Sequence, residues 1–169
     1  YGQPAPDVHG KHVLIGDFSF KRDVMKALGD DAKSVIVLDH HESAEAELQP
    51  WRCLVDKQNS PLTIAHVENA WTNERIGHVL ASFDMTRSGA RMVWDFCHEG
   101  EAPLLIRLIE DRDLWRFTMP ETKPFGVWLR CEPFDFHTWL KIDGALTDEK
   151  GRLALFNEAS AMQRFFDQK

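Results

Sequence analysis

Two short apolar runs, each followed by an aspartate, constrain the fold of this chain more than any other feature. The first run spans residues 12–16 and precedes Asp17, and the second spans residues 34–38 and precedes Asp39. Neither run alternates apolar with polar residues, and a helical segment over residues 20–28, closed by a glycine, separates them. Continuous apolar strands on either side of a helix are typical of parallel sheets covered on both faces. The sequence therefore predicts a parallel βαβ unit.

The rest of the chain reads as one further strand and several helices. Residues 78–83 suit a strand. Helices are indicated after Ser60-Pro61, after a cap at Thr86 or Ser88 and through Cys97, over residues 102–109, and along a C-terminal face of Leu155, Ala159, Met162 and Phe166. We expect an α/β fold, with a parallel βαβ sheet core and a predominantly helical second half, in a single domain.

Composition limits the compartments and partners. No apolar run approaches the roughly 18 residues that a membrane-spanning helix needs, and the N-terminus lacks a secretory pattern. The three cysteines, Cys53, Cys97 and Cys131, form no CxxC pair, which disfavours a disulfide framework or zinc knuckle. We expect Cys97 and Cys131 to be buried, and the protein to be cytoplasmic. The net charge of −7 disfavours broad binding to long nucleic acid.

The ends of the two predicted strands carry the residues with the clearest chemistry. Asp17 follows the first strand, and Asp39-His40-His41 follows the second. Ligands gather at the carboxyl edge of open α/β sheets, where neighbouring strands lie about 4.8 Å apart. Crowded carboxylates and imidazoles favour a compensating cation, and mixed oxygen and nitrogen ligation suits manganese or another divalent metal. Turn formation or helix capping is the structural alternative for each aspartate.

A third polar cluster lies where the helix predicted over residues 102–109 ends. Residues 108–115 read Leu-Ile-Glu-Asp-Arg-Asp-Leu-Trp. Asp111 is a candidate metal ligand, while Arg112 and Arg116 are candidate phosphate contacts through bidentate hydrogen bonds. A solvated rim at the end of a helix is the alternative interpretation.

Four ordered segments resemble motifs of the DHH phosphoesterase superfamily. Leu-Asp-His-His-Glu at residues 38–42 resembles its signature, and Gly-Asp-Phe-Ser at residues 16–19 resembles its preceding aspartate motif. Residues 84–90 resemble the segment that opens the helix after the central strands. Residues 109–115 resemble the final aspartate motif of the oligoribonuclease-like branch. The order and spacing match from about residue 12 to about residue 117.

The resemblance implies a site with two divalent cations, Mn²⁺ in the first instance and Mg²⁺ as an alternative. Asp17 would bridge the two cations, and His40 and Asp111 would ligate one of them. Asp39 would orient His40 through a hydrogen bond, and His41 would face the substrate phosphate. Asp39 and His41 are therefore the expected catalytic residues.

Several neighbouring side chains have roles that the resemblance leaves open. Asp113 is the alternative to Asp111 as the acidic ligand. His41, Arg112, Arg116 and Ser88 are the expected substrate-binding residues, although capping a helix is the alternative role for Ser88. The superfamily's upstream motif, with one His and two Asp residues, and its C-terminal DHHA1 domain are not found within residues 1–169. We therefore expect a DHH-type catalytic domain that is incomplete at both ends.

The activity implied is a manganese-dependent, exonuclease-like phosphoesterase. Such an enzyme would hydrolyse phosphodiester bonds of short oligonucleotides or small nucleotides with a metal-activated water. A polyphosphatase or pyrophosphatase of the same superfamily, and a non-catalytic nucleotide-binding remnant, are the alternatives. The expected partner is the nucleotide substrate, with no membrane and no long duplex; a homodimer is left open.

Overall fold

The computed structural model describes residues 4–52 and 78–168, and the chain divides into two compact units. The first unit is Tyr1–Gly100 and the second is Glu101–Lys169. Each unit has a hydrophobic core of its own. The helix expected after Ser60-Pro61 lies outside the described residues, and the single domain expected from the sequence stays a prediction.

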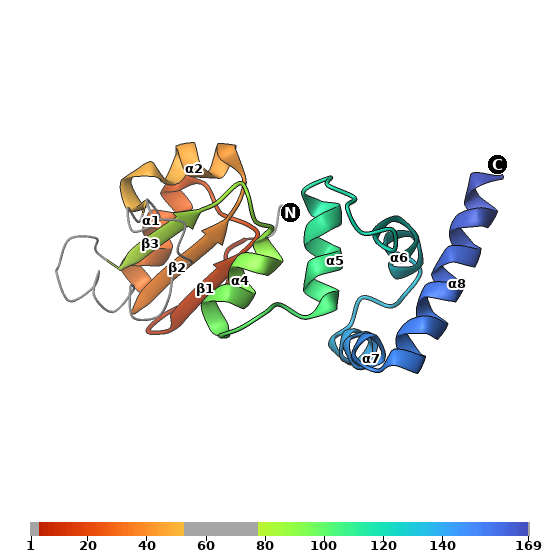
Figure 1. Ribbon diagram of the computed structural model, residues 1–169. Coiled ribbons are helices and arrows are strands. Elements are labelled where there is room, and N and C mark those ends of the chain that lie inside the picture. The colour runs from red at the N-terminus through yellow and green to blue at the C-terminus, as the bar shows by residue number, and fades with distance from the viewer. Residues whose placement is uncertain (1–3, 53–77, 169) are drawn as a thin grey trace. The chain divides into compact units, whose positions relative to one another are not determined.

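A parallel sheet forms the centre of the first unit (Figure 1). Its strands are β1 (His12–Gly16), β2 (Ser34–Asp39) and β3 (Val79–Phe83), hydrogen-bonded in the order β1-β2-β3. Helix α1 (Arg22–Asp31) connects β1 to β2. The predicted α/β fold and its βαβ unit are therefore confirmed, including both strands that precede an aspartate motif.

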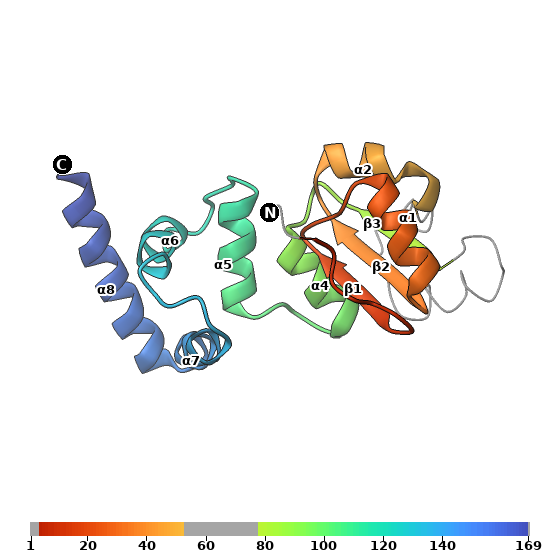
Figure 2. The same cartoon turned by 180° about the vertical axis from the view of Figure 1, so that it is seen from behind.

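Helices cover both faces of this sheet. Helices α1 and α2 (Glu42–Leu48) lie on one face, and α4 (Gly89–Cys97) lies on the other, as Figure 2 shows from behind. A short 3₁₀ helix, η1 (Gln49–Trp51), follows α2. Every residue of β2 is buried, which explains why residues 35–38 of this strand are continuously apolar.

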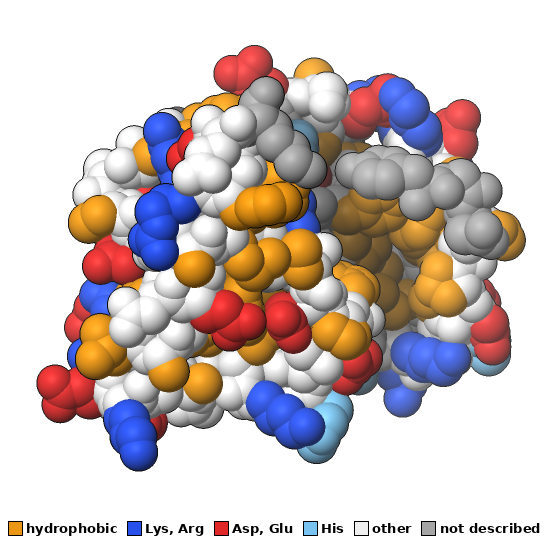
Figure 3. Space-filling view, turned by 90° about the vertical axis from the view of Figure 1, so that its right-hand side faces the viewer, with side chains coloured by type: hydrophobic (Ala, Val, Ile, Leu, Met, Phe, Trp, Pro, Cys, Tyr) orange, Lys and Arg blue, Asp and Glu red, His pale blue; other side chains and the backbone are white. Residues whose placement is uncertain are grey.

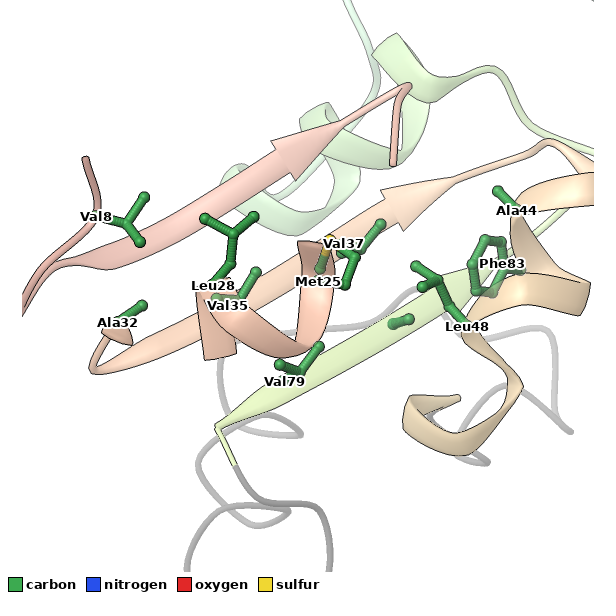
Figure 4. Packing of buried hydrophobic residues seen from close by; sticks show 11 residues of the cluster. Val8, Met25, Leu28, Ala32, Val35, Val37, Ala44, Leu48, Val79 and Phe83 are labelled. Atoms are coloured by element: carbon green, nitrogen blue, oxygen red, sulfur yellow. The ribbon is translucent and has the colours of Figure 1, made fainter. Parts of the chain in front are cut away.

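The larger core of the first unit lies between α1, α2 and the sheet (Figure 4). Met25 and Leu28 of α1 pack on Val35 and Val37 of β2. Burying an aliphatic side chain of this size stabilises the fold by about 1.5–3 kcal/mol. The apolar positions of the βαβ unit therefore fix α1 against the strands.

Helix α1 runs three residues beyond its expected end at Leu28, through the segment Gly29-Asp30-Asp31 that was expected to close it. Within the helix, Gly29 is buried. A Cβ atom at this position would collide with Cγ2 of Val79 on β3. Gly29 is therefore explained by close packing of helix on strand, whereas the sequence pattern alone resembled a helix stop.

The second unit is helical in all of its named elements. These are α5 (Leu104–Asp113), α6 (Thr122–Leu129), α7 (Phe136–Thr147) and α8 (Glu149–Asp167). Asp135 and Asp148 cap α7 and α8 by accepting hydrogen bonds from backbone N–H groups. The shared core includes Leu108, Phe125 and Leu155. A predominantly helical second half is thus confirmed, although α5 runs four residues beyond its expected end.

The two described cysteines differ from expectation, because Cys97 and Cys131 are exposed. Each lies at or just beyond the end of a helix, where its apolar neighbours, rather than the cysteine, face the core.

Exposed hydrophobic side chains are interspersed with charged ones on the face shown in Figure 3. Leu153, Phe165 and Phe166 of α8 are exposed hydrophobic side chains. Within the described residues, no helix combines the length and apolar character needed to cross a membrane.

The packing at Gly29 predicts opposite effects for two glycine-to-alanine substitutions in helices. Gly29→Ala should lower the free energy of unfolding, because the added methyl group collides with Val79. Gly144→Ala in α7 is the matched control: its Cβ meets nothing within 4 Å, so the better helix propensity should stabilise by up to about 1 kcal/mol. Urea denaturation of both variants measures the difference, and equal stabilisation by both would contradict the close contact.

Candidate metal centre

The centre is built on the carboxyl ends of β1 and β2. Asp17 directly follows β1, and its backbone N–H donates to the carbonyl of Leu38 at 2.9 Å. Its backbone adopts the left-handed conformation, with φ 58°, which aspartate tolerates better than most residues. The register pairs Gly16 with Leu38, so Asp17 lies beside Asp39 at the sheet edge.

Three side chains converge at this edge. Nε2 of His40 lies 3.0 Å from Oδ1 of Asp17. Asp17, His40 and His41 each offer one ligand atom, and these three atoms all lie within 4.8 Å of one another. The His40 side chain is only 11% exposed, whereas that of Asp17 is 52% exposed. The cluster thus has a buried imidazole on one side and a carboxylate open to solvent on the other.

The buried carboxylate of Asp39 contacts both histidines. Its side chain is 1% exposed, and its Oδ1 accepts the His40 backbone N–H at 2.8 Å. The same oxygen lies 2.6 Å from Nδ1 of His41 and fixes the orientation of that ring. A carboxylate that orients an imidazole is the usual outer partner in metal sites. The hydrogen bond to the His40 ring that the resemblance implies stays a prediction.

Helix α4 begins directly against Asp17. A Cβ atom on Gly89, the first residue of α4, would lie 2.5 Å from Cγ and Oδ1 of Asp17. Ser88 caps the helix: its hydroxyl accepts the N–H of Arg91 at 3.1 Å, and the residue is fully buried. This favours the capping role of Ser88 over the expected contact with substrate. The partial positive charge of the helix N-terminus also favours a carboxylate at this place.

A third strand end contributes an ion-pair network. Asp84 follows β3, and its carboxylate binds the N–H and hydroxyl of Thr86 and Nε of Arg87 at 2.6 Å. Arg87 also binds Asp95 on α4 at 3.1 Å. Burial would raise the pKa of Asp84, but the hydrogen bonds from Thr86 and Arg87 outweigh it and lower the pKa. Arg87 therefore ties α4 to the end of β3.

A small pocket of about 210 Å³ opens beside Asp17 and His41. Lys21 at this pocket forms a 3.4 Å ion pair with Glu47. The loop after β1 and the start of α2 supply the lining: Asp17, Phe18, Ser19, Phe20, Lys21, Asp39, His41, Ser43, Ala44 and Glu47. The volume lies below the roughly 300 Å³ typical of sites for whole drug-sized ligands, and it suits a group of the size of a phosphate.

The donor set fits one divalent cation. One carboxylate and two imidazoles converge within 4.8 Å, a mixture that suits manganese, zinc or iron. His41 is held through one ring nitrogen by a buried carboxylate, as metal-site imidazoles commonly are. Within the described residues this is the one cluster of three such side chains. The second cation implied by the resemblance stays a prediction.

Asp111 lies in the second unit and has a clear structural role there. Oδ1 accepts the N–H and hydroxyl of Thr118 at 2.9 and 2.6 Å. Oδ2 accepts the N–H of Met119 at 3.2 Å and the hydroxyl of Thr122. A carboxylate offers about four lone-pair positions, so all are in use. Burial would raise the pKa of Asp111, but these hydrogen bonds outweigh it and lower the pKa to about 2.

These bonds favour Asp113, which is exposed, over Asp111 as an acidic ligand. Arg112 and Arg116 are also exposed, and all four residues belong to the second unit. That any of them joins the centre formed by Asp17 stays a prediction.

Sequence reasoning did not find the close approach of Gly89 to Asp17, the ion-pair network of Asp84 or the pocket beside Phe18. Residues 84–90 were identified as a motif, and a glycine after a serine cap was a usable signal. The partner of that glycine lies 72 positions earlier in the chain, so spacing alone could not reveal it.

The hydrogen bonds of Asp111 predict that Asp111→Asn destabilises the second unit by about 2–3 kcal/mol at neutral pH, because an amide group would face donors. The folded pKa lies below the ordinary value of 3.8. The stabilisation is therefore complete above that value and is lost as the pH falls toward 2. Urea denaturation in EDTA from pH 7 to pH 2 should show the variant and wild type converging. Asp113→Asn is the exposed control and should change stability by less than about 0.5 kcal/mol.

Comparison with known proteins finds a relative in Acanthamoeba polyphaga mimivirus. An uncharacterized protein of this virus is 26% identical to the chain over 133 residues, which are 78% of the chain and 26% of the viral protein. The chain thus spans about a quarter of the length of the curated relative that it matches. No family model and no solved structure matches the chain.

Proposed function

We propose that this chain carries the metal centre of a phosphoesterase that hydrolyses phosphodiester bonds of short oligonucleotides or small nucleotides. The observation that carries the proposal is the convergence of Asp17, His40 and His41 within 4.8 Å, beside a phosphate-sized pocket at the carboxyl edge of the sheet. The resemblance to the DHH superfamily rests on the same residues and gives the substrate class. A cytoplasmic location and a short substrate, rather than a long duplex, are part of the proposal.

The chain's own side chains have distinct parts in this function. Asp17 and His40 hold a divalent cation, with Mn²⁺ proposed first and Mg²⁺ second. When bound, such a cation polarises a phosphoryl group and lowers the pKa of a water molecule to near neutrality. Asp39 keeps the His41 ring in place through Nδ1. His41, the third side chain of the cluster, also lines the pocket, and we assign it to the substrate phosphate. Lys21, at the same pocket, is paired with Glu47.

Metal binding is the first test of this proposal. Titration calorimetry of the chain with Mn²⁺ should show binding that Asp17→Asn and His40→Ala each weaken by at least tenfold, because each removes a ligand atom. Asp23→Asn on α1 and His137→Ala on α7 remove the same chemical groups at exposed positions and should leave the affinity unchanged. Equal Mn²⁺ affinity in all five proteins would refute the centre.

Hydrolysis is the second readout for the same set of proteins. With Mn²⁺, the wild-type chain should cleave a short oligoribonucleotide, and Asp17→Asn and His40→Ala should lose this activity. Faster hydrolysis of pyrophosphate to phosphate than of the oligonucleotide to mononucleotides would favour a pyrophosphatase instead. Metal binding without turnover of either substrate would favour a non-catalytic nucleotide-binding role.

The contact between Gly89 and Asp17 predicts an effect on metal binding without loss of any ligand. Gly89→Ala places a methyl group where the Asp17 carboxylate lies, so the carboxylate must move. Changes to outer groups of metal sites commonly cost about 10-fold to 100-fold in affinity, and Mn²⁺ calorimetry should show a loss in this range. Ala90→Gly at the next position is a control for altered helix propensity, and an effect equal to that of Gly89→Ala would contradict the steric cause.

A further inference from the structure

The helical unit contains a second pocket, with a volume of about 670 Å³. Its walls come from the end of α5, the loop that follows, α6 and Gln163 of α8. The pocket therefore belongs wholly to the second unit. Its volume is within the range of roughly 300–1,000 Å³ found for ligand sites, which is large enough for a mononucleotide.

Positive charge dominates the lining of this pocket. Arg112 on α5 and Lys123 and Arg130 on α6 all contribute, against one acidic side chain, Asp113. All three cations are exposed, and within residues 4–52 and 78–168 none of them forms an ion pair with a carboxylate. In a chain with a net charge of −7, such a concentration of positive charge favours an anionic ligand.

Two aromatic side chains lie beside these cations. Trp115 is 81% exposed, and its ring meets that of Phe117 edge to face, with centroids 5.7 Å apart. Nζ of Lys123 lies 5.1 Å from the centroid of Phe117, a cation–π contact. An exposed tryptophan next to positive charge is the combination on which nucleobases stack in proteins that bind single strands.

The loop that carries the aromatics is held in a costly conformation. Trp115 and Phe117 both have left-handed backbones, with φ 53° and 49°, which bulky residues rarely adopt. The carbonyl of Asp111 accepts the N–H groups of Arg116 and Phe117 at 2.9 and 3.2 Å, and its carboxylate holds Thr118. Strain of this kind is retained where a fixed geometry serves a ligand. The exposure of Trp115 is therefore built into the fold.

The position of Arg112 is set by a glycine. A Cβ atom at Gly126 on α6 would lie 2.9 Å from Cδ and 3.2 Å from Nε of Arg112. The guanidinium stem thus crosses α6 where a glycine leaves room for it. This contact brings the charge of α5 to the wall that carries Lys123 and Arg130.

We propose that this pocket binds a nucleoside phosphate, with the base stacked on Trp115 and the phosphate held by Arg112, Lys123 and Arg130. A bare anion would make no use of the exposed indole, and a neutral aromatic ligand would make no use of the three cations. The site deepens the proposed function, because it gives the helical unit a nucleoside phosphate as its ligand. It rests on that function only in identifying the nucleotide as part of the substrate.

Binding of 5′-AMP in EDTA tests this site independently of the metal centre. Calorimetry on the whole chain should show that 5′-AMP binds at least tenfold more tightly than adenosine, ribose 5-phosphate or inorganic phosphate. Trp115→Ala should weaken the binding of 5′-AMP by about 5-fold to 100-fold, the range for loss of one stacked base. Lys123→Met should weaken 5′-AMP and ribose 5-phosphate but not adenosine.

Matched controls separate local from general effects. Phe134→Ala removes an aromatic side chain that is 94% exposed in the same unit, and Lys150→Met removes an exposed lysine of α8. Both should bind 5′-AMP like wild type. Gly126→Ala keeps every charge but displaces Arg112 and should weaken 5′-AMP while leaving the urea midpoint unchanged or higher.

Two results would overturn the proposal. One is a 5′-AMP affinity that Trp115→Ala and Lys123→Met leave unchanged, and the other is equal binding of 5′-AMP and ribose 5-phosphate. Asp17→Asn separates this site from the proposed function, because it should weaken Mn²⁺ binding at least tenfold without changing 5′-AMP binding in EDTA. If the wild type binds 5′-AMP but does not bind Mn²⁺, the metal centre alone is refuted.

Discussion

Burial of β2 on both faces is the constraint on which the first unit depends. Each of its six residues is buried, so its backbone hydrogen bonds must be made to strands on both sides and its side chains must be covered by helices on both faces. Because β1 and β3 both pair with β2 in parallel, the carboxyl ends of the three strands lie at one edge of the sheet. Asp17, Asp39 and Asp84 follow from that arrangement, because each stands at the end of a strand.

A buried carboxylate has the corresponding part in the second unit. The carboxylate of Asp111 accepts four hydrogen bonds, three from the loop between α5 and α6 and one from Thr122, the first residue of α6. The left-handed backbones of Trp115 and Phe117 persist because this set of bonds determines the path of the loop. The same residue type is thus used in two ways: Asp17 is open to solvent beside two imidazoles, whereas Asp111 is saturated by hydroxyl and amide donors.

The sequence predicted the strand-end position of Asp17 but not the hydrogen bonds that surround Asp111. The strand that leads to Asp39 can be predicted from the sequence, because parallel strands buried on both faces have a continuous apolar pattern. The donors around Asp111 are two threonine hydroxyls and two backbone N–H groups of residues 118–122, and no periodic pattern in the sequence predicts them. Gly29 lies inside α1 and Cys97 is exposed, contrary to expectation, for a related reason. Propensity describes the backbone preference of a residue, whereas the place of these two residues depends on what packs next to them.

The sequence by itself determined the α/β class, the order of the strands along the chain, the helical second half and the identity of the residues at the strand ends. It did so because apolar periodicity and strand-end chemistry are local properties of the chain. Only the tertiary structure decided that Asp17, His40 and His41 meet, that α4 starts against Asp17 at Gly89, and that cations from α5 and α6 line one pocket with an exposed tryptophan. These are contacts between segments distant in sequence, and packing alone selects them.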